Sequence, residues 1–375
     1  MILDISDSEY KDMLNDERLF LPIRWSGIDF AETLENLFNR YIRRLEAYVD
    51  TEASYNAKLR VRVDVKEIKR VTGLLIKATN YYLNGFPAKA LNTFESVMKV
   101  LIRTPLRVYQ KSVTEQFCNP EWRYQDDLRL FRAARVLDNK PYQRTRVFHT
   151  PYNLRSKVST NRYSIAGYPS LYLSTSLDLC CNEIKADPNR DLIIAAAFKL
   201  ERAIEYTNTN IQVVELGVKP QDFLNITVEN EGSRRAIPRA LIEDVDVRAA
   251  YLLWYPLIAA CSFIRTNKND PFAAEYIIPQ LLMQWVRSEI NLKDCEDCDN
   301  LIGIRYFSCA SVKASDMGFN YVFPTSGQQK SAEIPYCAVL TRAFCLTNPV
   351  YIHEYDSIST CERKLLKSTN FDFIS

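Results

Sequence analysis

Residues 147–184 read VFHTPYNLRSKVSTNRYSIAGYPSLYLSTSLDLCCNEI, and they carry the clearest loop, strand and helix signals in the chain. Gly167 and Pro169 favour a turn, because glycine accepts positive φ angles and proline ends the element before it. The alternation in residues 170–173 predicts a short, half-buried strand. Residues 174–176, Ser-Thr-Ser, supply N-cap chemistry, and apolar residues at helical spacing follow them. The expected local order is therefore loop, strand, cap and helix.

Glu183 is the residue in this stretch that points most clearly to chemistry. It lies about two turns into the expected helix, where the helical period can bring it toward the strand face that carries Tyr172. A carboxylate beside a tyrosine ring suits a reaction in which positive charge develops on a sugar, because the carboxylate stabilises that charge. Nearby Arg or His side chains would then hold phosphate or ribose oxygens. The alternative is an ordinary solvated glutamate on a helix surface.

The same stretch resembles the core of the RES domain family, toxins that consume NAD or transfer ADP-ribose. The resemblance is strongest over residues 147–184 and extends to about residue 308. Four elements carry the resemblance and follow the family's order: Phe148-His149, Arg162-Tyr163, Tyr172-Leu173 and Glu183. Glu183 comes eleven residues after Tyr172, as the family pattern has it.

The resemblance implies a fold and a set of roles. The fold is α+β, with an ADP-ribosyltransferase-like mixed β core and helices. In this interpretation Tyr172 stacks on nicotinamide and Glu183 supports the charged ribose, both as catalytic residues. Arg162, within Arg162-Tyr163, holds the pyrophosphate.

His149 departs from the family pattern, which has an arginine at this place. A His-Tyr-Glu set is nevertheless the arrangement of the diphtheria-toxin-like branch of ADP-ribosyltransferases. His149 would then donate to a ribose hydroxyl, while Arg155 or Arg162 meets the adjacent phosphate. The alternative is a turn histidine that hydrogen-bonds only to backbone.

The serine of the family pattern has two candidate positions in this chain. Ser308 ends a strand expected over residues 303–308 and gives the better motif match. The second candidate for the role of the serine is Tyr276, which lies beside Gln280 near the start of an expected helix. A serine at a strand end also commonly caps the next turn, which is the simpler interpretation of Ser308.

The chain of 375 residues exceeds the usual size of one domain, so we expect two. Apolar periodicity predicts helices over 30–45, 65–78 and 88–102, with a stop and restart at residues 84–87. The expected division is a helical N-terminal domain, 1–146, and a RES-like catalytic domain, 147–375. Residues 123–146 are rich in arginine, and we interpret them as a solvated linker and helix surface. The alternative is a patch that faces phosphate.

Several segments after the central stretch have strand or helix patterns. Residues 191–200 form a nearly unbroken apolar run that suits a central strand, and residues 212–216 are a second strand candidate. Residues 251–264 are the most apolar window, expected as a buried helix or a strand-turn-helix. Residues 338–344 and 348–352 alternate as edge strands do.

Composition excludes several classes of protein. Lys and Arg number 48 against 46 Asp and Glu, so the near-neutral charge argues against broad nucleic-acid binding. The apolar runs are shorter than a transmembrane helix needs, and the first residues lack a signal-peptide pattern. We therefore expect a cytoplasmic protein with no membrane or nucleic-acid partner.

The ten cysteines are expected as free thiols. The Cys-Glu-Asp-Cys motif at residues 295–298 lacks the second pair of ligands that a structural zinc site needs, so no metal is expected.

Three functions remain open from the sequence. The first is an NAD-consuming enzyme that cleaves the nicotinamide–ribose bond, a glycohydrolase or a phosphorylase, with NAD as substrate. The family's biology implies a toxin of a toxin–antitoxin pair or of a phage-defence system, with an antitoxin or regulator on the helical domain. The alternatives are a protein ADP-ribosyltransferase and a non-catalytic module that binds NAD or ADP-ribose.

Overall fold

A computed structural model describes residues 2–5, 7–47, 61–103, 107–109, 129–200, 212–223, 247–267, 269–291, 301–325 and 335–374. The chain forms two compact units, each built from two separate stretches of sequence. The first unit comprises Met1–Val108 and Val218–Trp285, and the second comprises Tyr109–Gly217 and Val286–Ser375. Segments far apart in the sequence therefore build each core.

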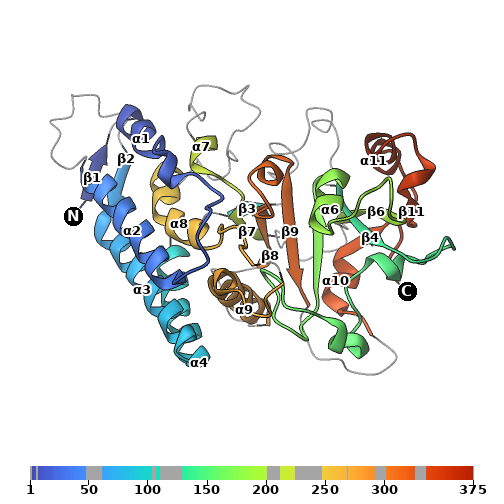
Figure 1. Ribbon diagram of the computed structural model, residues 1–375, viewed down its shortest axis with the longest axis horizontal. Helices are drawn as coiled ribbons and strands as arrows, with labels where there is room; N and C mark the ends of the chain where they lie inside the picture. The colour runs from blue at the N-terminus through green and yellow to red at the C-terminus, as the bar shows by residue number, and fades with distance from the viewer. Residues whose placement is uncertain are drawn as a thin grey trace. The chain divides into compact units, whose positions relative to one another are not determined.

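Helices dominate the first unit (Figure 1). Its described elements are β1 (Ile2–Ile5), α1 (Asp7–Leu14), η1 (Glu17–Leu19), α2 (Phe30–Glu46), β2 (Val61–Asp64), α3 (Val65–Leu83), α4 (Pro87–Leu101), α7 (Pro220–Phe223), α8 (Val247–Ala260), η7 (Ala274–Tyr276) and the first part of α9 (Ile277–Asn291). β1 and β2 pair in antiparallel orientation. The helices expected over 30–45, 65–78 and 88–102 are confirmed as α2, α3 and α4.

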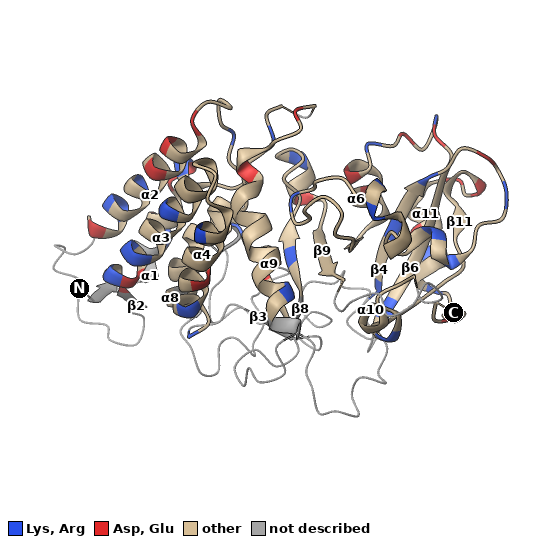
Figure 2. Ribbon diagram, turned by 90° about the horizontal axis from the view of Figure 1, so that it is seen from below, with Lys and Arg blue, Asp and Glu red and all other residues tan. Residues whose placement is uncertain are grey.

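α3 and α4 form the expected helical hairpin. α3 starts after Asp64, whose carboxylate accepts a hydrogen bond from the Lys66 amide at 2.9 Å. The turn between the helices uses Gly85 at φ +81°, a conformation that other residues adopt only with strain. Pro87 then occupies the first turn of α4, where its missing N–H costs nothing. Charged side chains recur along α2, α3 and α4, whose apolar stripes are buried (Figure 2).

α8 is the buried helix of this unit. Trp254 and Tyr255 are almost completely buried, and the Tyr41 ring lies 4.5 Å from the Tyr255 ring. The Tyr41 hydroxyl donates to the Leu252 carbonyl at 2.7 Å, so its polar atom is satisfied inside the core. Pro256 lies within the helix. The buried helix expected for this window is thus confirmed, and the strand-turn-helix alternative is wrong.

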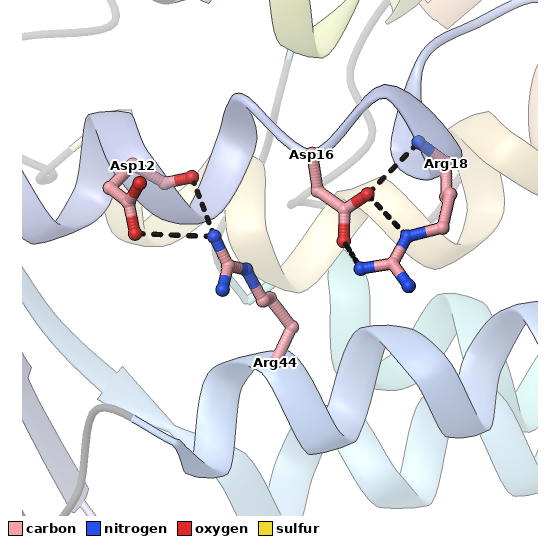
Figure 3. Close-up of polar contacts among 4 residues, drawn as sticks. All are labelled: Asp12, Asp16, Arg18 and Arg44. Carbon is pink, nitrogen blue, oxygen red and sulfur yellow. Dashed lines mark hydrogen bonds and ion pairs between the residues drawn. The ribbon is translucent and has the colours of Figure 1, made fainter.

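Two sets of polar contacts fix α1 and the residues after it (Figure 3). Arg44 of α2 donates to the carbonyl and the carboxylate of Asp12, both at 3.2 Å. The Asp16 carboxylate accepts from the Arg18 amide at 3.0 Å and from two guanidinium nitrogens at 2.7 and 2.6 Å. These hydrogen bonds from Arg18 lower the pKa of Asp16. The segment between α1 and α2 is therefore held by charge-assisted contacts as well as by packing.

A mixed sheet is the frame of the second unit. Among the described residues it has nine strands, in the order β10-β6-β4-β5-β9-β8-β7-β3, and β11 also pairs with β6. Their bounds are β3 (Arg107–Tyr109), β4 (Arg129–Arg135), β5 (Ser170–Ser174), β6 (Ile193–Leu200), β7 (Gln212–Leu216), β8 (Leu301–Phe307), β9 (Phe319–Pro324), β10 (Phe344–Leu346) and β11 (Val350–Tyr351). β7 and β8 run parallel, whereas β9 pairs with β5 and β8 in antiparallel orientation.

Short helices accompany this sheet: η3 (Arg144–Val147), η4 (Tyr152–Lys157), α6 (Leu177–Glu183), η9 (Lys313–Asp316), α10 (Ala338–Ala343), η10 (Ile352–Glu354) and α11 (Ile358–Leu366). α6 packs against β4 and β5, and α11 packs against α6 and β6. A largely antiparallel mixed sheet with separate helices confirms the α+β class expected from the sequence.

The local order of the central stretch is confirmed. β5 follows the loop, Ser176 caps α6 by accepting from the Leu179 amide at 3.2 Å, and α6 ends at Glu183. The strands expected over 191–200, 212–216 and 303–308 are β6, β7 and β8. β6 lies between β4 and β10 and is almost wholly buried, although the middle of the sheet is formed by β5 and β9.

Two expectations were wrong. Residues 129–135, expected within a solvated linker and helix surface, form β4, which pairs with β6 along its whole length. Residues 338–343, expected as an edge strand, form α10. Their alternation resembles a strand pattern, but Thr341 and Arg342 donate side-chain hydrogen bonds to the Ala338 carbonyl, which is a local helical contact. The strand expected over residues 348–352 is present only as β11.

In the described part of the chain, no helix combines the length and hydropathy that crossing a bilayer requires. The seven cysteines in this part are free and buried. The motif at residues 295–298 lies outside the described residues, and no group of three or more metal-ligating side chains occurs within them.

Candidate functional site

The site is organised by the junction between β5 and α6, which three side chains attach to the start of β9. The Ser174 hydroxyl donates to Asn320 Oδ1 at 2.6 Å. The Thr175 hydroxyl accepts from the Phe319 amide at 2.9 Å, and the Ser176 hydroxyl donates to the Met317 carbonyl at 3.1 Å. The N-cap chemistry recognised in the sequence therefore also ties α6 to a strand far away in the chain.

Gly318 allows this close attachment. Its φ angle is +126°, and a side chain at this position would meet the Thr175 hydroxyl. Glycine is needed here both for its backbone conformation and for the space that Thr175 occupies.

Glu183 is the last residue of α6 and is exposed, but its carboxylate is oriented. Oε1 accepts a hydrogen bond from Asn320 Nδ2 at 2.7 Å, while Asn320 Oδ1 accepts from Ser174. The two bonds fix the orientation of the Asn320 amide, and Asn320 in turn fixes Glu183. Within the described residues the second carboxylate oxygen, Oε2, has no hydrogen-bond partner. Glu183 thus presents a positioned oxygen to a ligand.

Tyr306 lies close to this carboxylate, and Tyr172 lies close to Tyr306. Burial raises the pKa of Tyr306 well above its ordinary value, and the nearby Glu183 and Tyr172 raise it further, while Arg162 lowers it. The Tyr172 hydroxyl is hydrogen-bonded to the Ser164 hydroxyl at 2.8 Å. Glu183, Tyr172 and Arg162 therefore all lie near the Tyr306 phenol. Their functional roles stay predictions.

Arg162 and Tyr163 sit in a tight turn. Asn161 and Ser164 exchange backbone hydrogen bonds of 2.9 and 3.1 Å, which closes the turn. Tyr163 is buried, and its ring centroid lies 4.7 Å from that of Tyr306. The turn thus places Arg162, itself largely buried, beside the aromatic residues of the site.

Arg132 is a further cation near the site, and it was not among the residues predicted from the sequence. It projects from β4 and donates to the Phe148 carbonyl at 2.6 Å. Burial lowers its pKa to about 10; Cys180 and Tyr172 act in the opposite direction, which places Arg132 near Tyr172. The signal in the sequence was an arginine between the apolar residues Phe131 and Ala133. An arginine flanked by apolar residues in a strand is expected to have a fixed partner, because an isolated buried charge is costly.

His149 is buried, and both of its ring nitrogens have backbone partners. Nδ1 lies 2.8 Å from the Thr150 carbonyl, and Nε2 accepts from the Cys337 amide at 3.0 Å. Burial lowers its pKa to about 4. A neutral imidazole with Nδ1 protonated satisfies both bonds. The contact with ribose stays a prediction, and the ring would have to leave one of these partners to make it.

Arg155 belongs to a cation–aromatic cluster on the same loop. Its guanidinium lies 4.9 Å from the Tyr152 ring centroid and 5.9 Å from that of Tyr168. The Arg287 guanidinium lies 4.5 Å from the Tyr168 ring, which is partly exposed. No carboxylate in the described part of the chain forms an ion pair with Arg155. Such a cluster suits a phosphate or a flat base.

Three other predicted residues have contacts of their own. Ser308 is fully buried, and its hydroxyl accepts from the Ala310 amide at 3.2 Å, which is the turn-capping role. Tyr276 and Gln280 belong to the first unit; Arg265 lies 5.2 Å from the Tyr276 ring, and Gln280 is buried. The functional roles of Ser308, Tyr276 and Gln280 stay predictions.

Comparison with known proteins gives one informative similarity. No protein-family model matches the chain, and no solved structure matches it. The chain is similar to a Bacillus subtilis (strain 168) protein named "Putative toxin YopC". The two are 24% identical over 347 residues, which cover 90% of this chain and 69% of the relative. The similarity spans both compact units and connects the chain, at a distance, with a protein named as a toxin.

Proposed function

We propose that this protein is a toxin that consumes NAD by cleaving the nicotinamide–ribose bond, on a RES-like core of the ADP-ribosyltransferase type. The observation that carries the proposal is the arrangement of Glu183. Its carboxylate is oriented by Asn320, has one oxygen without a partner among the described residues, and lies near Tyr306, which Tyr172 and Arg162 also approach. The name of the B. subtilis relative supports the toxin part of the proposal.

The proposed mechanism uses charge stabilisation rather than a covalent intermediate. As the bond to nicotinamide lengthens, the ribose carbon becomes positive, and the fixed Glu183 carboxylate stabilises it. Tyr172 stacks against the departing ring, with its hydroxyl held by Ser164. Arg132 and Arg162 hold the pyrophosphate by charge-assisted hydrogen bonds. The electron pair of the broken bond leaves with nicotinamide. Water, phosphate or a protein side chain then forms a bond to the same ribose carbon.

The test is nicotinamide release by the purified full chain, with and without inorganic phosphate, followed by chromatography. We expect wild type to release nicotinamide and Glu183→Gln to lose at least about 100-fold in rate, because the neutral amide cannot stabilise the cation. Glu354→Gln removes another exposed glutamate of the same unit and should leave the rate unchanged. Equal turnover by wild type and Glu183→Gln would remove Glu183 from the mechanism.

A binding module remains the second candidate, because His149 and Ser308 are both engaged by backbone groups. In that case ADP-ribose would bind with the same affinity to wild type and Glu183→Gln, while neither released nicotinamide, even in a cell extract. A protein ADP-ribosyltransferase would differ from both, since label from the adenine half of NAD would become attached to protein.

A further inference from the structure

A cavity in the second unit is lined by none of the residues assigned to the proposed NAD site. It has a volume of about 370 Å³ and is bounded by the connection from β10 to β11, the end of α11 and the C-terminal segment. The lining residues used below are Thr347, Asn348, Tyr355, Lys364, Lys367 and Asn370. The volume lies within the range of small-molecule sites.

The charges of the cavity are of one sign. Lys364 and Lys367 line it, and none of its lining residues is an aspartate or a glutamate. Neither lysine forms an ion pair with a carboxylate in the part of the chain that the structure describes. The C-terminal end of α11 contributes partial negative charge, which the amides of Lys367 and Ser368 reduce by donating to the Arg363 and Leu365 carbonyls at 3.2 Å. The two ammonium groups therefore set the preference of the cavity for an anion.

The walls of the cavity are attached to the sheet, so it exists before a ligand arrives. Thr347 donates from its amide to the Ala197 carbonyl at 3.0 Å and accepts from the Ala197 amide at 3.1 Å. Leu346 and Asp372 exchange backbone hydrogen bonds of 2.9 and 3.1 Å, which join β10 to the C-terminal segment. A preformed site loses less entropy on binding than one that must close.

The remaining side chains define the class of ligand. Asn348 and Asn370 supply amide donors and acceptors, and Tyr355 supplies a partly buried ring. Lysines bind phosphate as mobile point charges, whereas an aromatic ring favours a flat group beside it. We propose that this cavity binds a phosphomonoester that carries a flat ring, of the size of a nucleoside monophosphate, at a site separate from the NAD site.

Binding of AMP to the purified full chain tests the proposal, measured by isothermal titration calorimetry with adenosine and inorganic phosphate as comparison ligands. The Lys364→Gln/Lys367→Gln double variant should weaken AMP binding by at least about tenfold, because two charge-assisted contacts are lost. Both lysines are exposed, and the thermal unfolding midpoint of the variant checks its folding. Adenosine should bind at least about tenfold more weakly than AMP for the same reason.

Two matched variants separate this cavity from other cationic surfaces. Lys313→Gln removes an exposed lysine outside the cavity, and Arg155→Gln removes the guanidinium beside Tyr152 and Tyr168, which the sequence also predicts to meet phosphate. Both should keep the AMP affinity of wild type. Absence of AMP binding at millimolar concentration, or binding that Arg155→Gln abolishes and the double variant keeps, would overturn the proposal. Phosphate bound as tightly as AMP would contradict the class of ligand. The Glu183→Gln variant serves as a background without turnover, so the outcome does not depend on NAD cleavage.

Discussion

Asn320 controls Glu183 through an uncharged amide. A cationic partner would neutralise the carboxylate, whereas the amide orients Glu183 and leaves its full negative charge for a ligand. The orientation depends on Ser174, because its hydroxyl binds the oxygen of the Asn320 amide and leaves the nitrogen for Glu183. The orientation of the Glu183 carboxylate thus rests on two uncharged residues, Asn320 and Ser174.

Asn320→Asp tests this arrangement. The variant would place a second carboxylate about 3 Å from Glu183, so that one proton is shared between the two groups near neutral pH. We expect the rate of NAD cleavage at pH 7 to fall by about 100-fold and to recover partly as the pH rises, because Glu183 is then ionised again. The pH profile of kcat measures this effect. A loss that is the same at every pH would indicate damage to the fold instead.

His149 should make the stability of the second unit sensitive to mild acid. Its pKa falls from the ordinary value of 6.5 to about 4 in the folded protein, so below pH 6.5 the unfolded chain binds the proton and the folded chain does not. Stability is therefore greatest above pH 6.5 and falls as the pH drops toward 4. Between pH 7 and pH 5 this residue should remove about 2 kcal/mol of the free energy of unfolding.

Urea unfolding of wild type and His149→Gln at the two pH values isolates the effect, since other groups titrate equally in both proteins. Wild type should lose more stability than the variant on going to pH 5. A loss of the same size in both proteins would contradict the buried, neutral imidazole.

At the scale of elements, the β5–α6 junction and the start of β9 are joined by hydrogen bonds of Ser174, Thr175 and Ser176. Their attachment requires Gly318 at φ +126° against Thr175. Gly318→Ala should lower the free energy of unfolding by about 1–3 kcal/mol, since it adds backbone strain and displaces the Thr175 hydroxyl from the Phe319 amide. Chemical denaturation measures the change.

Gly73 is the matched control, because it lies inside α3 and a Cβ atom added there would meet no other atom within 4 Å. Gly73→Ala should raise stability by about 0.5–1 kcal/mol through helix propensity. Similar effects of the two substitutions would show that Gly318 has no special role.

The sequence predicts the elements best where local signals and tertiary packing agree. α2, α3 and α4 carry apolar stripes at helical spacing, and β5 with α6 carries turn, alternation and cap signals in the right order. α10 was mistaken for a strand because its alternating apolar residues are also good helix formers. β4 was missed because arginines at residues 129, 132 and 135 resemble a solvated helix face. In the fold, β6 pairs with this segment. A short stretch of sequence does not reveal a strand partner that lies more than fifty residues away.

At the scale of the whole molecule, the proposed function predicts a specific sequence of events in a cell. Induced expression of the wild-type chain should lower cellular NAD before growth stops, and Glu183→Gln should do neither. NAD content and growth, measured together after induction, check this prediction. Growth arrest that precedes any fall in NAD would favour another target.

The candidate site shows what a sequence alone leaves open. Tyr172, Glu183 and Arg162 lie in one continuous stretch, so their proximity could be anticipated from the strand-helix pattern. Arg132, Tyr306 and Asn320 come from β4, β8 and β9, and only the pairing of strands brings them to that stretch. Ser308 is predicted from a motif; the structure shows it buried with its hydroxyl on the Ala310 amide, and its functional role stays a prediction. Long-range strand order was the missing information.

The order of strands also has a consequence for the chain during its synthesis. β8 and β9, which fill the sheet between β5 and β7, are made more than a hundred residues after β5. A nascent chain that has not passed residue 320 therefore lacks β9, one of the two neighbours of β5, and the amide that orients Glu183. Under the proposed function, a product that terminates before residue 320 should therefore lack NAD cleavage, because it lacks the Asn320 amide that orients Glu183.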